Sequence, residues 1–226
     1  MAKKVFIGVG HGGNDPGAVS GKIKEKDLNL KIALVLRDEL KRHGIEVGIS
    51  RTKDENDDLN EEIRECNKFA PDLALDIHNN AGGGDGAEVF YYSGGGTSKT
   101  LAKNVLAEIE KTGQQSRGIK TRVEGGVDYF GFIREIVAPS VIVECAFVDN
   151  KTDVKAVNDA KGQKTMGTAI AKGVLKTLGI NYKAEKTDTK AEKAYYLYVG
   201  DYKTKKDAET VQKKLKEIGI TAKIKQ

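Results

Sequence analysis

Short apolar runs alternate along the chain with longer segments in which apolar residues recur every three or four positions. The first pattern is typical of buried strands, and the second is typical of helices with one buried face. The short runs predict strands at KVFIGV, EVGIS, LALDIH, AEVFYY and SVIVECAF, and a further strand at YFGFI. The periodic segments predict helices over residues 27–43, 59–70, 98–111 and 164–178.

The order of these elements indicates the fold class. Strands that alternate with helices are typical of α/β proteins, in which a mainly parallel, twisted sheet carries helices on both faces. The turn residues agree, because Asp27 can cap the first helix, Gly44 can end it and Pro71 halts the second. Residues 113–128 form a looser segment between the third helix and YFGFI.

The sequence pattern divides the chain into three parts. Residues 1–180 are long enough to form one domain with a sizeable core. Residues 181–194, NYKAEKTDTKAEKA, are mostly polar and predict a linker. Residues 195–226 have a strand–helix–strand pattern in which Thr204 and Asp207 are spaced as a helix-capping pair. This pattern predicts a small βαβ unit, which buries little surface by itself.

The net charge of +5 lies entirely in the last part of the chain. Residues 1–180 hold 26 basic and 26 acidic residues, whereas residues 181–226 hold 12 lysines and 7 acids. A basic tail on a neutral body favours an anionic polymer as a partner, and ordinary solvated lysines are the alternative explanation.

Two features of the sequence concern membrane insertion and secretion. No window has the roughly 18 consecutive apolar residues that a membrane span requires, so we expect no membrane partner, and we expect no nucleic-acid partner either. The apolar run after the basic pair in MAKKVFIGVGHGG is too short for a secretory signal. We therefore expect synthesis in the cytoplasm without a Sec signal.

Polar residues with metal-binding chemistry stand where strands should end. His11, His78 and Glu144 each close a short apolar run, and Glu25 stands just before the first helix. Sites in open α/β sheets are built at the carboxyl ends of the strands. Two imidazoles and a carboxylate suit a tetrahedral metal with one open position, and a further carboxylate would supply a base. The pattern indicates a hydrolytic zinc site.

Simpler explanations exist for several of these residues. The loop around Gly10 could cradle a phosphate, but no GK[ST] follows and the glycine spacing is not G-x-G-x-x-G. His78 could be a hydrogen-bonded strand-end histidine, with Asp76 on the same strand face as a candidate partner. His43, in KRHG, is expected only to interact with the end of its helix.

Two cysteines, Cys66 and Cys145, stand alone without a CxxC motif or a disulfide framework. Cys66 follows apolar residues at helical spacing, which indicates a buried thiol. Cys145 directly follows Glu144, and we expect a small core residue there rather than a nucleophile.

Several separated segments carry a resemblance: GVGHGGNDPGA, EKDLNL, ISRT, NEEIRECNKFAPDLALDIHNN and APSVIVECAFVDN. Over roughly residues 3–178 the chain resembles the zinc-dependent N-acetylmuramoyl-L-alanine amidases of the amidase-3 type, which are cell-wall hydrolases of bacteria and phages. The resemblance implies one zinc ion held by His11, Glu25 and His78, with Glu144 as the catalytic carboxylate. It also implies peptidoglycan as the substrate, cleaved between the lactyl group of N-acetylmuramic acid and L-alanine of the stem peptide.

The sequence departs from the family pattern at a few places. Gly8 and Val9 stand where the family usually has Asp-Pro, and Asp76 stands where it usually has serine. Cys145 begins a segment that is more glycine-like in the family. These departures concern the surroundings of the site and the substrate preference, since all four functional residues are present.

The residue types also indicate the mechanism. Glu144 would take a proton from the attacking water and return it to the leaving amine. Arg134 and Asn80 are candidate substrate-binding residues, with a plain exposed arginine as the alternative for Arg134. A closed four-ligand site that includes Glu144 would instead predict a non-catalytic wall-binding protein with a structural or vestigial zinc.

The tail sequence YLYVGDYKTKKDAETVQKKL resembles half of a sporulation-related repeat, a peptidoglycan-binding module. A full module contains two such βαβ units, so two chains could pair residues 195–226 in a homodimer, and a truncated or self-sufficient wall-binding tag is the alternative. An endolysin that is released through a holin pore and an autolysin that acts when a mother cell lyses both fit a wall hydrolase of this kind.

Overall fold

The computed structural model describes residues 2–56, 58–185, 199–220, 222 and 224. The chain divides into two compact units, Met1–Lys183 and Ala184–Gln226. Within the described ranges, none of the helices has the length and apolar character needed to cross a membrane.

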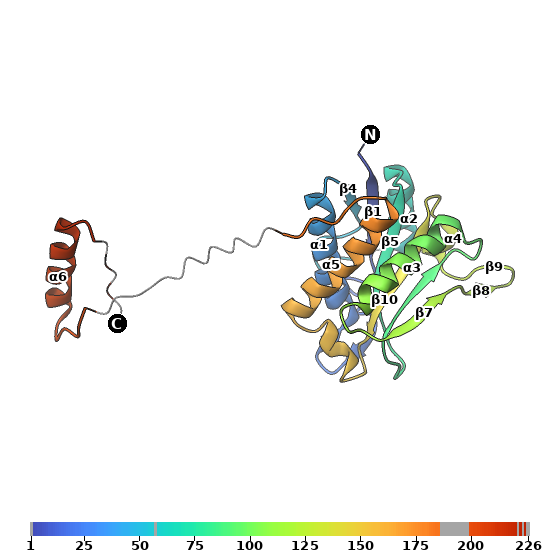
Figure 1. Cartoon of the computed structure of the whole chain (residues 1–226). Coiled ribbons are helices and arrows are strands. Elements are labelled where there is room, and N and C mark those ends of the chain that lie inside the picture. Colours follow the sequence, from blue (N-terminus) through green and yellow to red (C-terminus); the bar gives the residue numbers. More distant parts are fainter. Residues whose placement is uncertain (1, 57, 186–198, 221, 223, 225–226) are drawn as a thin grey trace. The chain divides into compact units, whose positions relative to one another are not determined.

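A six-stranded sheet forms the centre of the first unit (Figure 1). Four neighbouring strands run parallel, whereas β6 is antiparallel to β10 and β7 is parallel to β6. This topology confirms the prediction of a mainly parallel α/β fold. In spatial order the strands are β4 (Glu46–Ile49), β1 (Lys4–Val9), β5 (Leu73–Asn80), β10 (Ser140–Phe147), β6 (Ala87–Tyr91) and β7 (Ser116–Lys120).

Helices cover both faces of the sheet. One face packs against α1 (Glu25–Arg42), α3 (Gly96–Glu110) and α5 (Ala160–Thr177), which together bury the larger hydrophobic core. The other face packs against α2 (Leu59–Phe69) and the short α4 (Gly131–Glu135) around a smaller aromatic cluster. Because residues alternate between the faces of a strand, each strand contributes to both cores.

Three short pieces of structure complete the unit. Two small hairpins are formed by β2 (Val19–Ser20) with β3 (Ile23–Lys24), and by β8 (Val123–Glu124) with β9 (Val127–Asp128). A single 3₁₀ turn spans Asp153–Ala156.

The structure corrects the sequence prediction in residues 113–133. YFGFI is not a strand, because α4 begins at Gly131 and buries Phe132 and Ile133 against the α2 side of the sheet. A short apolar run does not distinguish the two states by its period. The looser segment contains β7, β8 and β9, whose exposed and polar residues gave no strand signal. Asp27 is not the N-cap, because α1 already begins at Glu25.

In the second unit, α6 (Lys205–Glu217) confirms the predicted tail helix. The Thr204 hydroxyl accepts a hydrogen bond from the Asp207 amide at 3.2 Å, as the capping pair predicts. Of the predicted flanking strands, residues 195–198, 221 and 223 lie outside the described residues. Residues 199–202 lie within them and do not form a strand.

Candidate metal centre

The Gly-rich loop after β1 carries the first candidate ligand. His11 has φ = 63°, in the left-handed region that residues other than glycine rarely adopt. Gly10 lies directly against the ring of His78, where a Cβ atom would overlap the imidazole. The Gly10 amide also donates to the Ile77 carbonyl at 3.1 Å. The loop is therefore pressed onto the end of β5.

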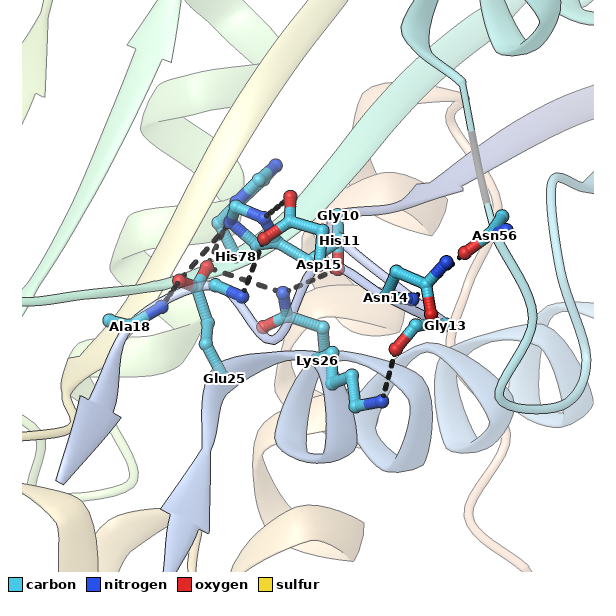
Figure 2. Close-up of polar contacts among 12 residues, drawn as sticks. Gly10, His11, Gly13, Asn14, Asp15, Ala18, Glu25, Lys26, Asn56 and His78 are labelled. Carbon is cyan, nitrogen blue, oxygen red and sulfur yellow. Dashed lines mark hydrogen bonds and ion pairs between the residues drawn. The ribbon is translucent and has the colours of Figure 1, made fainter. Parts of the chain in front are cut away.

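Two buried cations hold this loop in place. The Arg51 guanidinium donates to the carbonyls of Val9 at 3.1 Å and Gly10 at 3.3 Å. Lys26 donates to the Gly13 carbonyl at 2.7 Å and pairs with Asp54 at the same distance. Figure 2 shows the Lys26 ammonium reaching the loop from α1. These contacts support the backbone conformation that places the His11 ring, a role that the sequence did not reveal for either cation.

The carboxylate of Glu25 joins the two histidines. Glu25 Oε2 lies 3.2 Å from His11 Nε2, and Oε1 lies 3.0 Å from His78 Nδ1. The imidazole rings meet edge to face with centroids 5.1 Å apart. One ligand atom from each of the three residues lies within 4.8 Å of the others. Figure 2 shows the three side chains converging from the loop, α1 and β5.

Each histidine also meets a second carboxylate on its other ring nitrogen. Asp15 Oδ2 lies 2.7 Å from His11 Nδ1, and Asp76 Oδ2 lies 3.0 Å from His78 Nε2. A metal-binding histidine commonly donates its outer N–H to a carboxylate, which fixes the ring and its tautomer. The inner nitrogens, which face Glu25, are therefore the candidate metal-binding atoms of this arrangement.

The electrostatics of this cluster favour a bound cation. Burial would raise the pKa of Glu25, but the hydrogen bonds with His11 and His78 hold it far below its ordinary value. The Glu25 contact raises the pKa of His11. Burial would lower the pKa of His78, and the carboxylates of Asp76 and Glu25 raise it well above 6.5. The cluster thus keeps a carboxylate ionised and attracts positive charge.

Glu144 lies beside this cluster on the neighbouring strand. It is the register partner of His78 across β10 and β5, and of Glu88 across β10 and β6. Side chains that lie opposite each other share one face of a sheet, so the three form a row on the α2 side. Glu144 Oε2 is buried without a hydrogen-bond partner in the described part of the chain. Burial raises the pKa of Glu144 to about 7, and nearby carboxylates add to this.

The row continues into a polar network that sequence analysis missed. Buried Glu88 Oε2 accepts from Arg117 at 2.7 Å and from Lys120 at 2.5 Å. Asn80, a predicted substrate-binding residue, donates to Glu88 Oε1 at 3.0 Å. The sequence signal for this network was the pair of cations in SRGIK, Arg117 and Lys120. In a regular strand, residues three apart point to opposite faces, so nothing in the sequence pattern placed both cations on one carboxylate.

The remaining candidates have structural contacts. Arg134 on α4 donates to the backbone carbonyls of Asp128 at 2.8 Å and Tyr129 at 3.1 Å, which ties β9 to the helix. Its predicted role in substrate binding stays a prediction. His43 is the C-cap of α1, as expected for a residue at the end of its helix, and it also stacks on Tyr182.

Both cysteines are free and buried, as predicted. Burial raises the pKa of the Cys66 thiol to about 12, and it also raises the pKa of Cys145 well above its ordinary value. Neither thiol is therefore prepared as a nucleophile.

Comparison with known proteins gives matches over both units. A family model for N-acetylmuramoyl-L-alanine amidase matches residues 5–176, and a model for the SPOR domain matches residues 170–226. The amidase CwlM of Bacillus licheniformis is 29% identical over 97% of this chain and 83% of its own length. The sporulation-specific N-acetylmuramoyl-L-alanine amidase of Bacillus subtilis is 32% identical over 92% of this chain and 78% of its own length.

Solved structures agree with this. Cwp6 from Clostridium difficile superposes with a TM-score of 0.77 at 40% identity, over 79% of this chain and 30% of that one. The catalytic domain of the amidase CwlV from Paenibacillus polymyxa gives a TM-score of 0.72 at 29% identity, over 79% of this chain and 99% of that one. The chain therefore belongs to the N-acetylmuramoyl-L-alanine amidase family, and it is a peptidoglycan hydrolase with a C-terminal SPOR domain.

Proposed function

We propose that His11, Glu25 and His78 hold one zinc ion and that Glu144 is the general base and acid of amide hydrolysis. One observation carries the proposal. Three ligand atoms converge within 4.8 Å, and the neighbouring Glu144 has a buried oxygen without a hydrogen-bond partner among the described residues. The cleaved bond would join the lactyl group of N-acetylmuramic acid to L-alanine of the stem peptide.

The three residues fit zinc by their chemistry. Two imidazole nitrogens and one carboxylate oxygen are a common ligand set for catalytic zinc, which keeps one position open. The outer nitrogens of both histidines already lie against Asp15 and Asp76, as expected for oriented ligands. A zinc ion bound here would supply a water molecule of lowered pKa and polarise the scissile carbonyl.

Glu144 performs the proton transfers in this proposal. Its carboxylate accepts a proton from the attacking water and then donates that proton to the amide nitrogen as the bond to L-alanine breaks. A group that both takes and gives a proton works best with a pKa near the working pH. Burial raises the pKa of Glu144 to about 7 and so meets this condition.

The tail would bind the wall. The SPOR match over residues 170–226 supports peptidoglycan as its ligand, and its 12 lysines from residue 181 onward favour anionic wall polymers as well. Pairing of two tails in a homodimer is part of the same proposal. Light scattering of the full chain at micromolar concentration tests it, and a monomer would contradict the pairing.

The proposed function is tested with purified Gram-positive cell walls. We expect the protein to lower wall turbidity and release new N-terminal alanine, to lose both activities after EDTA, and to regain both when zinc is restored. Release of new reducing sugar ends instead of alanine would contradict the bond assignment. Full activity after complete removal of metal would contradict the zinc centre.

A further inference from the structure

A bulge in β7 brings two cations to one carboxylate. The register between β6 and β7 shifts between Ala87 and Val89, and Gly118 in the shifted segment has φ = 85°. In a regular strand Arg117 and Lys120 would point to opposite faces, because they are three residues apart. The extra residue puts both on the face of Glu88, where they meet the same oxygen, Oε2.

This cationic pair, defined as Arg117 and Lys120, keeps an excess of positive charge. Among the described residues, Glu88 is the only carboxylate within ion-pair distance of either cation. One buried carboxylate therefore faces two cations. The side chains of Arg117 and Lys120 are 36% and 34% exposed, so an anion from solution can reach them.

The cationic pair lies on the peptide side of the proposed reaction centre. Glu144 gives its proton to the nitrogen of L-alanine, so the leaving peptide starts beside Glu144. Glu88 is one strand further from the histidines, and the cationic pair reaches Glu88 from the next strand. Adjacent strands are about 4.8 Å apart. A peptide that extends about 3.5 Å per residue covers that distance within two or three residues.

We propose that the cationic pair binds a free carboxylate of the stem peptide, next to the scissile bond. The inference rests on the proposed function and names a substrate preference for the same site. Two carboxylates are within reach: the α-carboxylate of a γ-linked glutamate after L-alanine, and the extra carboxylate of a diamino diacid at the third residue. In both cases Glu88 acts as a positioning residue, because it fixes the cations without touching substrate.

The test compares matched substrates with zinc-loaded full-length protein. N-Acetylmuramoyl-L-alanyl-D-isoglutamate and its isoglutamine amide differ only in the first carboxylate. Muramoyl tripeptides built on isoglutamine and ending in diaminopimelate or lysine differ in the second. We expect kcat/KM about tenfold higher for the carboxylate member of one pair, mostly through KM, because a hydrogen bond to a charged group is lost in the other member.

Variants assign the preference to the cationic pair. Arg117→Gln and Lys120→Gln each leave one cation on Glu88, and each should remove most of the preference. Glu88→Gln should lower the preference, since the two cations lose the carboxylate that fixes them. Lys111→Gln is the control and should change nothing, because this cation is paired with Glu108 at the C-terminal end of α3, which packs on the other face of the sheet.

The outcomes separate the two proposals. Equal kcat/KM for both members of both pairs, or a wild-type preference that survives in Arg117→Gln and Lys120→Gln, would overturn the inference while leaving the amidase mechanism intact. Failure of the zinc-loaded protein to cleave any of the four substrates would count against the proposed function itself. A preference within one pair identifies which carboxylate is bound.

Discussion

Two buried glutamates near the carboxyl ends of the parallel strands, Glu25 and Glu144, differ in the hydrogen-bond donors around them. Glu25 receives the His11 and His78 ring nitrogens, and its oxygens also accept from the Ala18 amide at 2.9 Å and the Asn79 amide at 3.1 Å. Its pKa lies far below the ordinary value. Glu144 has a buried oxygen without a hydrogen-bond partner in the described chain, and burial raises its pKa to about 7.

This difference shows how one fold prepares the same side chain for two tasks. Burial raises the pKa of a carboxyl group, and nearby positive charges and donors directed at its oxygens reverse the effect. Glu25 is held in its charged form, which suits a cation, whereas the raised pKa of Glu144 suits the proton transfer that we propose for it. His78 links the two carboxylates, because it contacts Glu25 and is the register partner of Glu144.

The largest expected effect is the loss of zinc affinity when Glu25, which lies between the two histidines, is replaced. Glu25→Ala removes the anion between His11 and His78, so their inner nitrogens face each other without a compensating charge. We expect zinc affinity to fall by more than the roughly 10–100-fold typical of an outer-shell partner. Competition with a chromophoric chelator measures this loss. Zinc affinity within a few-fold of wild type would show that Glu25 is not a ligand.

Replacing Glu144 by glutamine should stabilise the metal-free protein by an amount that depends on pH. A folded-state pKa of about 7 against an ordinary 4.5 means that Glu144 contributes stability that is fully present below pH 4.5 and lost as the pH rises through 7. Glutamine does not titrate. Glu144→Gln should therefore be more stable than wild type at pH 8, by up to about 3 kcal/mol, and much less so at pH 5.

Urea unfolding of the EDTA-treated proteins at both pH values measures this gain. Glu110→Gln, on the exposed side of α3, is the matched control and should show no such trend. An equal stability change at pH 5 and pH 8 for Glu144→Gln would contradict the raised pKa.

Smaller losses of zinc affinity are expected when Asp15 or Asp76, which contact the outer nitrogens of the two histidines, is replaced. Asp76 is buried against His78, whereas the Asp15 side chain is 65% exposed beside His11. Asp76→Asn should weaken zinc binding about 10–100-fold. Asp15→Asn should weaken it less, because solvent screens the exposed pair. The same chelator competition measures both variants, and the reverse order would show that burial does not set the strength of these supports.

Much of the fold was predictable because its signals are local. Apolar periodicity located the four longer helices of the first unit and five strands of the sheet. The apolar runs LALDI and SVIV led to His78 and Glu144, although β5 continues to Asn80 and β10 continues to Phe147. YFGFI failed because five apolar-rich residues fit either state until their neighbours are known. In the structure, the helical conformation buries Phe132 and Ile133 on the α2 side of the sheet.

The polar network beside Glu144 could not be predicted for a different reason. Glu88 faces Glu144 only because β6 runs antiparallel to β10, and strand order is not encoded in local periodicity. Arg117 and Lys120 join it only through the β7 bulge. Arg51 and Lys26 were equally hidden, since their partners are backbone carbonyls of a loop distant in sequence.

The central claim is that His11, Glu25 and His78 hold the zinc ion, whereas Glu144 transfers the proton. The most direct test measures zinc stoichiometry, zinc affinity and amide hydrolysis together in wild type and Glu144→Gln. The account predicts one zinc per chain at an affinity within about threefold in both proteins, with hydrolysis in the variant lower by about 10²–10⁴-fold. Loss of zinc from Glu144→Gln would show a closed four-ligand site, and near-normal hydrolysis with zinc retained would contradict the role of Glu144.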